Sequence, residues 1–347
     1  MNENELISIA RRISARGKGL LAIDESSATC NRRFAAFDIA GTAPLRRACR
    51  DWMVGAPGLS ASISAVILND ETINQHTLAD VPFAQAVADA GMIPGVKVDM
   101  GLAPFHGDCG EQVTLGLDGL RERLARYHAM GARFAKWRAV VRVDENLPSH
   151  ACVMANAHAL ARFAALCQEA GLVPVVEPEI LMAGEHALLR SAAVSECVLR
   201  MVFAQLVEQE VLLEGLILKT SMVLPGLACV EQAEPALVAE MTVRSMRRAV
   251  PAAVAAIAFL SGGQTPAQAT LRLNALQQGQ GTQPWAMTFS FGRALQQPAL
   301  ALWQGHEDNV AAAQRALVYR ASCNSQARCG RYHAADDAQA TWDRAIA

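Results

Sequence analysis

The chain has 347 residues, 52% of them hydrophobic, and a formal net charge of −2. This composition supports a large buried core and argues against disorder. The balance of 31 basic against 33 acidic residues offers neither a basic surface for nucleic acid nor a polybasic segment for an anionic membrane. The amino-terminal segment lacks the apolar core of a signal peptide, and no apolar run is long enough to span a bilayer. We therefore expect a cytoplasmic protein.

The cysteines and histidines give no sign of a metal or a disulfide framework. Nine cysteines are scattered along the chain without a CxxC pair, which is typical of small buried side chains in a reducing compartment. The eight histidines form neither an HxH nor an HExxH motif. We expect no metal site and no cofactor.

Eight short apolar runs predict buried parallel strands, which are apolar on both faces. They cover residues 19–25, 63–70, 93–99, 133–141, 172–180, 213–222, 255–263 and 285–292. Between them lie stretches with helical spacing, most clearly residues 118–130 and 149–170. Eight alternations of strand and helix predict an α/β fold, a closed (β/α)8 TIM barrel, and no GxGxxG motif follows the first strand to support an open dinucleotide-binding sheet. We expect one barrel domain over residues 1–325 and a mobile, polar, alanine-rich tail over residues 326–347.

Lysine is rare in this chain: only Lys18, Lys97, Lys136 and Lys219 occur among the 31 basic residues. Arginine stays protonated, whereas a buried lysine can lose its proton and attack a carbonyl group. Codon bias accounts for the scarcity of lysine but not for the placement of three of the four on predicted barrel strands. These three lysines are therefore candidates for chemistry.

Ionisable residues gather at the carboxyl ends of the predicted strands, where barrel enzymes hold their active sites. Buried charges are costly unless paired, so the opposite charges in this set should offset one another. An ion-pair network that only closes the barrel is the alternative, but such clusters are more often functional. The set comprises Asp24, Glu25 and Ser26 at the end of the first strand, Lys97 and Asp99 on the third, Lys136 and Arg138 on the fourth, Glu177 and Glu179 on the fifth, and Lys219 on the sixth.

The last two strands lead into glycine-rich turns, at the position where this fold usually holds phosphate. The residues are Ser261, Gly262 and Gly263 after the seventh strand, and Ser290, Gly292 and Arg293 after the eighth. Glycine lets backbone N–H groups approach phosphate oxygens, and arginine can bind them with two hydrogen bonds. Tight turns that need no ligand are the alternative interpretation.

Seven segments in this order resemble the class I fructose-bisphosphate aldolases, and the likeness extends from Glu5 to about Arg331. They are GKGLLAIDES at 17–26, GVKVDMG at 95–101, FAKWR at 134–138, VPVVEPEIL at 173–181, LEGLILKTSMVLPG at 213–226, FLSGGQ at 259–264 and PWAMTFSFGRALQ at 284–296. The resemblance implies a metal-independent lyase that forms a Schiff base with fructose 1,6-bisphosphate, and a homotetramer.

The resemblance also implies roles for individual residues. Lys219 forms the imine with C2 of the sugar, and Lys136 and a partly apolar pocket favour the neutral amine. Glu177 transfers protons, Glu179 orients and neutralises the lysines, and Asp24 takes the C4 hydroxyl proton. The C1 phosphate is held by Ser261, Gly262, Gly263, Ser290, Gly292 and Arg293. The far half of the substrate is bound by Ser26, Arg33, Lys97 and Arg138.

Two other functions stay open at this point. Another Schiff-base sugar-phosphate aldolase would share Lys219 but need one phosphate site, whereas two basic groups favour a bisphosphate. An inactive barrel that serves as a binding scaffold would be expected to lose Lys219, Glu177 or Asp24, and all three are present. The residues do not choose among fructose 1,6-bisphosphate, fructose 1-phosphate and sedoheptulose 1,7-bisphosphate, and they fix neither oligomeric state nor direction of flux.

The sequence departs from the family pattern in three places. Ser27-Ala28-Thr29 stands where the family commonly has Thr-Gly-Ser, and Phe291 replaces a tyrosine. No tyrosine follows Tyr332, whereas many relatives end in a tyrosine that helps to protonate the enamine. We predict slower proton exchange on bound dihydroxyacetone phosphate than in tyrosine-ended relatives, or a proton supplied by water or a carboxylate. The rate is measured as tritium released from labelled dihydroxyacetone phosphate to the solvent. Equal rates would contradict this prediction.

Overall fold

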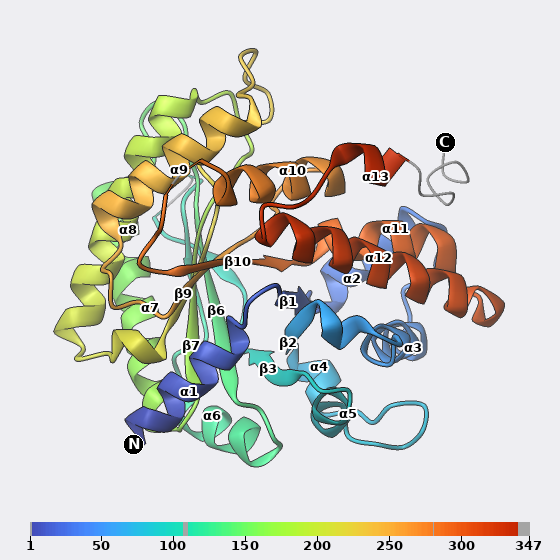
Figure 1. The fold of residues 1–347 in the computed structure, drawn as a ribbon. Helices are drawn as coiled ribbons and strands as arrows, with labels where there is room; N and C mark the ends of the chain where they lie inside the picture. Colours follow the sequence, from blue (N-terminus) through green and yellow to red (C-terminus); the bar gives the residue numbers. More distant parts are fainter. Residues whose placement is uncertain (1, 107–109, 280, 339–347) are drawn as a thin grey trace.

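Eight parallel strands form a closed barrel in the computed structural model, which describes residues 2–106, 110–279 and 281–338 (Figure 1). Around the barrel the strand order is β1-β10-β9-β8-β7-β6-β3-β2. The predicted (β/α)8 barrel is confirmed, and each strand falls within a predicted apolar run. The strands are β1 Gly19–Ala22, β2 Ile63–Leu68, β3 Ile93–Lys97, β6 Phe134–Val141, β7 Val173–Ile180, β8 Ile217–Thr220, β9 Ala256–Phe259 and β10 Ala286–Phe291.

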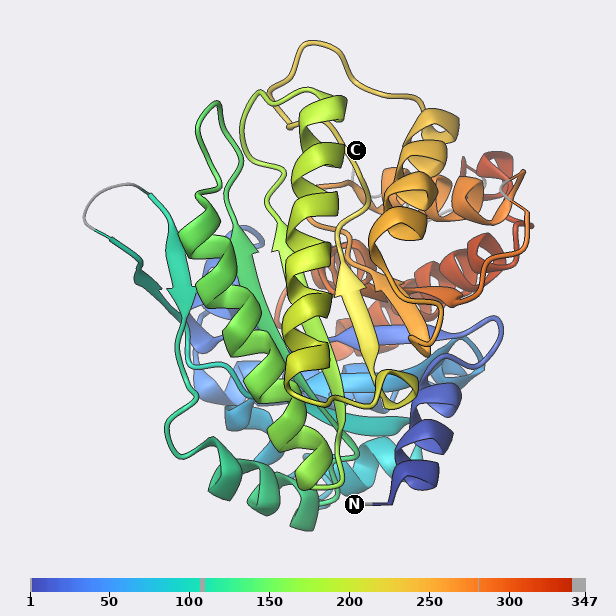
Figure 2. The same cartoon turned by 90° about the vertical axis from the view of Figure 1, so that its left-hand side faces the viewer.

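Helices connect successive strands and surround the barrel (Figures 1 and 2). The two clearest predictions are confirmed by α6, Leu120–Ala129, and α7, His150–Glu169. The N-cap of α7 is Ser149, which accepts a hydrogen bond from the N–H of Cys152. The other long elements are α2 Ser27–Ala35, α3 Ala43–Val54, α5 Phe83–Asp89, α8 Leu188–Glu208, α9 Pro235–Ala249, α10 Pro266–Gln277, α11 Arg293–Trp303 and α12 Val310–Arg328.

A short antiparallel hairpin follows β3 and was not predicted from the sequence. It pairs β4, Leu102–Pro104, with β5, Gln112–Thr114. Strands of three residues are too short to show an alternating pattern, so no periodic signal marks them in the sequence. The hydroxyl of Thr114 donates to the carbonyl oxygen of Arg138 over 2.8 Å, so the hairpin is fastened to the carboxyl-terminal half of β6.

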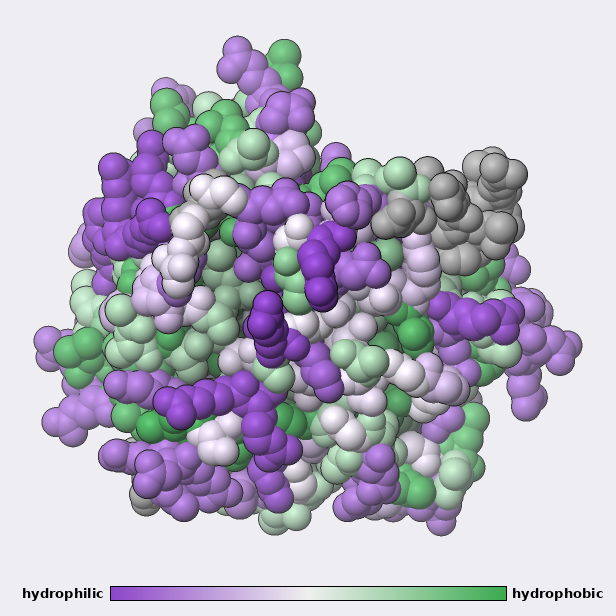
Figure 3. All heavy atoms as spheres, in the orientation of Figure 1, coloured by the Kyte–Doolittle hydropathy of each residue, from purple (hydrophilic) through white to green (hydrophobic). Residues whose placement is uncertain are grey.

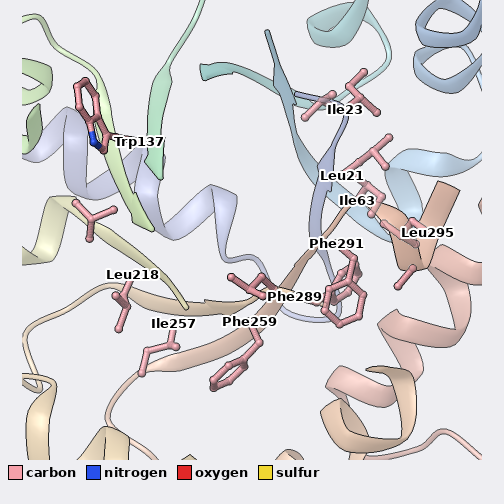
Figure 4. Packing of buried hydrophobic residues seen from close by; sticks show 14 of the residues in the cluster. Leu21, Ile23, Ile63, Trp137, Leu218, Ile257, Phe259, Phe289, Phe291 and Leu295 are labelled. Carbon is pink, nitrogen blue, oxygen red and sulfur yellow. The ribbon is translucent and has the colours of Figure 1, made fainter. Parts of the chain in front are cut away.

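Alternate residues of the strands face two separate apolar clusters. Leu20, for example, belongs to the cluster inside the barrel and Leu21 to the larger cluster outside it, as the alternation of side chains along a strand requires. Figure 4 shows part of the outer cluster, in which the rings of Phe289 and Phe291 lie 5.3 Å apart between centroids. Phe291, which replaces the family tyrosine, is therefore packed among apolar side chains of this outer cluster.

The amino-terminal end of the barrel is closed by α1, Glu3–Ile13. Its buried residues Leu6, Ile9 and Ile13 join the cluster inside the barrel. In Figure 2, β8 (yellow) points toward the top of the view and α1 (dark blue) lies at the lower end. Among the described residues, the barrel is thus closed at its amino-terminal end and has its cavity at the carboxyl-terminal end.

The surface face in Figure 3 mixes hydrophilic and apolar side chains. No helix within the described part of the chain is both long enough and apolar enough to cross a membrane.

Residues 326–338 are described and include the last turn of α12 and the short helix α13, Ala334–Ala338. Arg328 donates to the carbonyl oxygen of Ser14 over 2.6 Å, and Arg320 and Tyr332 both contact the buried Asp337. A division between barrel and tail at residue 325 stays a prediction. Residues 339–347, which include part of that tail and the end that lacks a tyrosine, lie outside the described residues.

We predict that Gly95→Ala destabilises the fold because the added methyl group overlaps one neighbouring side chain, that of Phe134. Gly95 on β3 lies opposite Phe134 on β6, and a methyl group at Gly95 would lie 2.2 Å from the Phe134 ring. Overpacking of this kind costs about 1–3 kcal/mol, measured by urea unfolding. Phe134→Leu removes the ring, so the double variant should lose less stability than the two single variants together. Strict additivity would contradict this explanation.

Candidate active site

A cavity of about 1020 Å³ opens at the carboxyl ends of the barrel strands. All but one of the fifteen residues predicted for the site line it, so the structure brings together segments from seven of the eight strands. The lining includes Asp24, Ser26, Arg33, Lys97, Lys136, Arg138, Glu177, Glu179, Lys219, Ser261, Gly262, Ser290, Gly292 and Arg293.

The exception among the predicted residues is Gly263, which does not line the cavity. A methyl group at this position would lie 2.6 Å from Cδ1 of Leu227, so Gly263 faces the loop after β8. Its neighbour Gly262 has φ of +53°, a conformation that favours glycine. Because of this turn, Gly262 lines the cavity whereas Gly263 faces Leu227.

Four buried ionisable side chains form a continuous chain of contacts at the base of the cavity. Glu177 lies between two lysines, with Oε1 2.9 Å from Nζ of Lys219 and Oε2 2.6 Å from Nζ of Lys136. Lys136 also donates to Oδ2 of Asp24 over 2.7 Å. All four are at most 7% exposed. Burial of this kind is tolerated because two positive charges face two negative ones.

The ion pairs control the protonation of this buried cluster. Burial alone would raise the pKa of Asp24, but the charges of Lys136 and Lys219 outweigh it and lower the pKa to about 2. Burial also opposes the charge of Lys136, yet Asp24 and Glu177 outweigh that effect and raise the pKa of this lysine. The pKa of Glu177 is lowered by the two lysines against the effect of burial.

The two lysines differ in how many carboxylates hold them. Lys136 contacts both Asp24 and Glu177, whereas Glu177 is the one carboxylate among the described residues within ion-pair distance of Lys219. The negative charge at the base of the cavity is therefore divided unequally between the two lysines.

The contacts of Glu179 differ from the role expected from the sequence, which was to neutralise the lysines. Its Oε2 accepts a hydrogen bond from Nε of Arg138 instead. Lys136 and Arg138 are two residues apart on β6, as are Glu177 and Glu179 on β7, so each pair of side chains points the same way. The ion pairs therefore form two successive levels, Lys136–Glu177 below and Arg138–Glu179 above.

Two further cations, Lys97 and Arg33, line the cavity. Nζ of Lys97 is 2.7 Å from Oδ1 of Asp99. Arg33 forms an ion pair with Glu25 and donates to Oε1 of Gln296 over 3.0 Å.

The loops after β9 and β10 are tied together by Arg293, whose guanidinium donates to the carbonyl oxygen of Gly262. Ser290 is 1% exposed and its hydroxyl has no hydrogen-bond partner among the described residues, so a buried donor faces the cavity. No side chain caps the amino-terminal end of α11 at Gly292, and such an end attracts anions. Together these groups suit a phosphate.

Within the described residues, no group of three or more His, Cys, Asp and Glu side chains could hold a metal ion. The expectation that the chain uses no cofactor stays a prediction.

Proteins with a similar sequence and structure show the family of this chain. Residues 5–346 match the model of the family described as fructose-bisphosphate aldolase class-I. The chain belongs to this family. It is 51% identical over 333 residues to a probable fructose-bisphosphate aldolase class 1 of Xanthomonas campestris pv. campestris, which covers 96% of this chain and 99% of the relative.

Other class I aldolases are nearly as similar. Cytosolic fructose-bisphosphate aldolase 4 of Arabidopsis thaliana is 46% identical, over 94% of this chain and 84% of the relative. The solved structure of the Plasmodium falciparum aldolase, in complex with TRAP and a small-molecule inhibitor, superposes with a TM-score of 0.93 at 43% identity. That alignment covers 95% of this chain and 96% of the other.

Several residues that hold the aldolase site together were given no role from the sequence, although two of them, Glu25 and Asp99, belong to the ionisable residues at the predicted strand ends. Asp99, Glu25 and Gln296 supply partners to predicted cations, and the buried Arg50 and Asn69 both donate to the carbonyl oxygen of Glu25. Asp99 ends the predicted third strand and Glu25 the first, so the rule that had singled out Asp24 applied to them as well. Arg50 and Asn69 had no such signal, because their partners are backbone atoms of another segment.

The lowered pKa of Asp24 predicts how stability depends on pH. Because the folded-state pKa of about 2 lies below the ordinary value of 3.8, the ion pair stabilises the fold above pH 4, and this stabilisation is lost as pH falls toward 2. We expect Asp24→Asn to lower the free energy of unfolding by about 2 kcal/mol at pH 6 and by much less near pH 2. Urea unfolding at stepped pH measures this.

A matched control for this measurement is Glu169→Gln, which removes the exposed pair with Arg121 and should change stability little at any pH. A difference between wild type and Asp24→Asn that does not vary with pH would contradict the assigned ion pair.

Proposed function

We propose that this class I aldolase cleaves fructose 1,6-bisphosphate reversibly to dihydroxyacetone phosphate and glyceraldehyde 3-phosphate through an imine on Lys219. The observation that carries the proposal is the buried chain of contacts Lys219–Glu177–Lys136–Asp24 at the base of a cavity with phosphate-binding groups at its rim. The family match and the catalytic names of its relatives support the same reaction.

Imine formation begins when the neutral amine of Lys219 attacks C2 of the ketose. The resulting carbinolamine must lose its hydroxyl group as water, and this requires a proton. Glu177 is placed to supply and later remove that proton, because its Oε1 lies 2.9 Å from Nζ of Lys219. The positive iminium then serves as the acceptor for electrons from the breaking bond.

Cleavage of the C3–C4 bond needs a base for the C4 hydroxyl proton. Asp24 is ionised down to about pH 2 and contacts Lys136 at the end of the cavity next to Lys219. As Asp24 takes the proton, the C4 oxygen becomes an aldehyde, the bond electrons move to the iminium, and the first product leaves. Protonation of the remaining enamine at C3 and hydrolysis of the imine release dihydroxyacetone phosphate and the free lysine.

The two ends of the substrate are held by different groups. Arg293, the Ser290 hydroxyl and the turn at Ser261 and Gly262 suit the C1 phosphate, which is near the imine carbon. Lys97, Arg138, Arg33 and Ser26 suit the phosphate at C6. Two cationic ends support a bisphosphate over a substrate with one phosphate.

The remaining assignments rest on family likeness. We propose that the enzyme acts without a metal ion, in the cytoplasm, as a homotetramer. The reaction then belongs to glycolysis, gluconeogenesis or Calvin-cycle sugar-phosphate metabolism.

We predict that borohydride traps dihydroxyacetone phosphate on Lys219 in the presence of a chelator, as read by peptide mass spectrometry. Lys219→Met should abolish the adduct and slow single-turnover cleavage at least about 10³-fold, because the covalent route is lost. Arg293→Ala should lower kcat/KM only about 10- to 100-fold, the effect of losing hydrogen bonds to a charged group.

Lys18→Met provides the matched control, since Lys18 does not line the cavity, and it should keep both adduct and rate. An adduct on Lys97 or Lys136 would show that the nucleophile is assigned to the wrong residue. The absence of any adduct in the wild-type enzyme would overturn the proposed reaction.

A further inference from the structure

Asp99 is a nearly buried carboxylate in the cavity for which the mechanism above has no use. It follows β3, lines the cavity, and its side chain is only 5% exposed. Oδ1 lies 2.7 Å from Nζ of Lys97, and Oδ2 accepts a hydrogen bond from the backbone N–H of Arg138 over 3.3 Å. One carboxylate thus links the ammonium of Lys97 to the backbone of β6 at Arg138, a strand that carries another cation proposed to bind the phosphate at C6.

Lys97 is held at two points by the same residue. Its ammonium also donates to the backbone carbonyl oxygen of Asp99 over 3.0 Å. A lysine side chain has a flexible four-carbon stem and a compact charge, so without such contacts the position of the ammonium would be spread over many rotamers. Asp99 therefore places the charge before a ligand arrives.

Two other carboxylates of the cavity, Asp24 and Glu177, compete with Asp99 for the ammonium of Lys97. Lys97 lies in register with Lys136 on the neighbouring strand, and Lys136 contacts Asp24 and Glu177. A third ammonium that moved toward those two carboxylates would change the balance of charge around Lys219. Because Asp99 gives Lys97 a carboxylate partner, the two functions of the cavity stay separate.

We propose that Asp99 is a positioning residue that fixes Lys97 at the far end of the cavity and thereby sets the preference for a ketose bisphosphate over a ketose 1-phosphate. This inference rests on the proposed function, in which the imine forms near the C1 phosphate and Lys97 meets the phosphate at C6. A substrate without the second phosphate makes no use of Lys97 and should be indifferent to Asp99.

The test compares kcat/KM for fructose 1,6-bisphosphate and fructose 1-phosphate in Asp99→Asn. Asparagine keeps the shape and an acceptor for the Arg138 N–H but removes the charge that holds Lys97. We expect kcat/KM for the bisphosphate to fall about 10-fold or more, mainly through KM, since misplaced binding groups have effects of this order. The value for fructose 1-phosphate should stay within about twofold.

Two further variants separate positioning from general damage. Asp337→Asn breaks another buried ion pair, with Arg320, at a residue that does not line the cavity, and it should leave the substrate ratio unchanged. In a Lys97→Met background, Asp99→Asn should have almost no additional effect on the ratio, because the group that it positions is gone.

Each outcome decides the proposal. An equal loss for both substrates, an unchanged ratio, or a full additional loss in the Lys97→Met background would overturn the role of Asp99. Failure of the proposed function is a separate result, because it would appear in the wild-type enzyme as no cleavage and no trapped adduct on Lys219.

Discussion

The contact of Glu177 with two lysines is the interaction on which the rest of the site depends. One carboxylate oxygen faces Lys219 and the other faces Lys136, so a single side chain pairs with both lysines. Asp24 adds a second negative charge beside Lys136. The two carboxylates are thus divided unequally between the two lysines, and the proposal that Lys219 forms the imine builds on this difference.

Such a cluster is stable only because the barrel holds it rigidly. Removing one partner from a buried ion pair leaves an uncompensated charge, which costs about 3–5 kcal/mol. The cluster sits directly above the apolar interior filled by Leu20, Phe134 and the side chains of α1, and this interior keeps the strand ends in place. Lys136 and Arg138 lie on β6, and Glu177 and Glu179 on β7, so two neighbouring strands carry both levels of ion pairs.

Much of this arrangement could be predicted from the sequence, because strands buried on both faces are apolar and charges within them are conspicuous. Lys136, Glu177 and Lys219 stood out for that reason. The partners of these charges were harder to predict: Glu179 was expected near the lysines but contacts Arg138, since pairing depends on the relative level of adjacent strands. Gly263 and the β4–β5 hairpin depend on turn geometry, for which short segments carry no periodic signal.

The distribution of ion pairs makes the cations of the cavity unequal. Lys97, Arg138 and Arg33 each have a carboxylate partner before substrate arrives, in Asp99, Glu179 and Glu25 respectively. Among the described residues, no carboxylate lies within ion-pair distance of Arg293, which donates to a backbone carbonyl. Under the proposed function, a phosphate beside Arg293 would meet a charge without a carboxylate partner, whereas a phosphate beside Lys97 would share its cations with their existing carboxylates. The contacts of Asp99, Glu179 and Glu25 would then weigh on how strongly the second phosphate is bound.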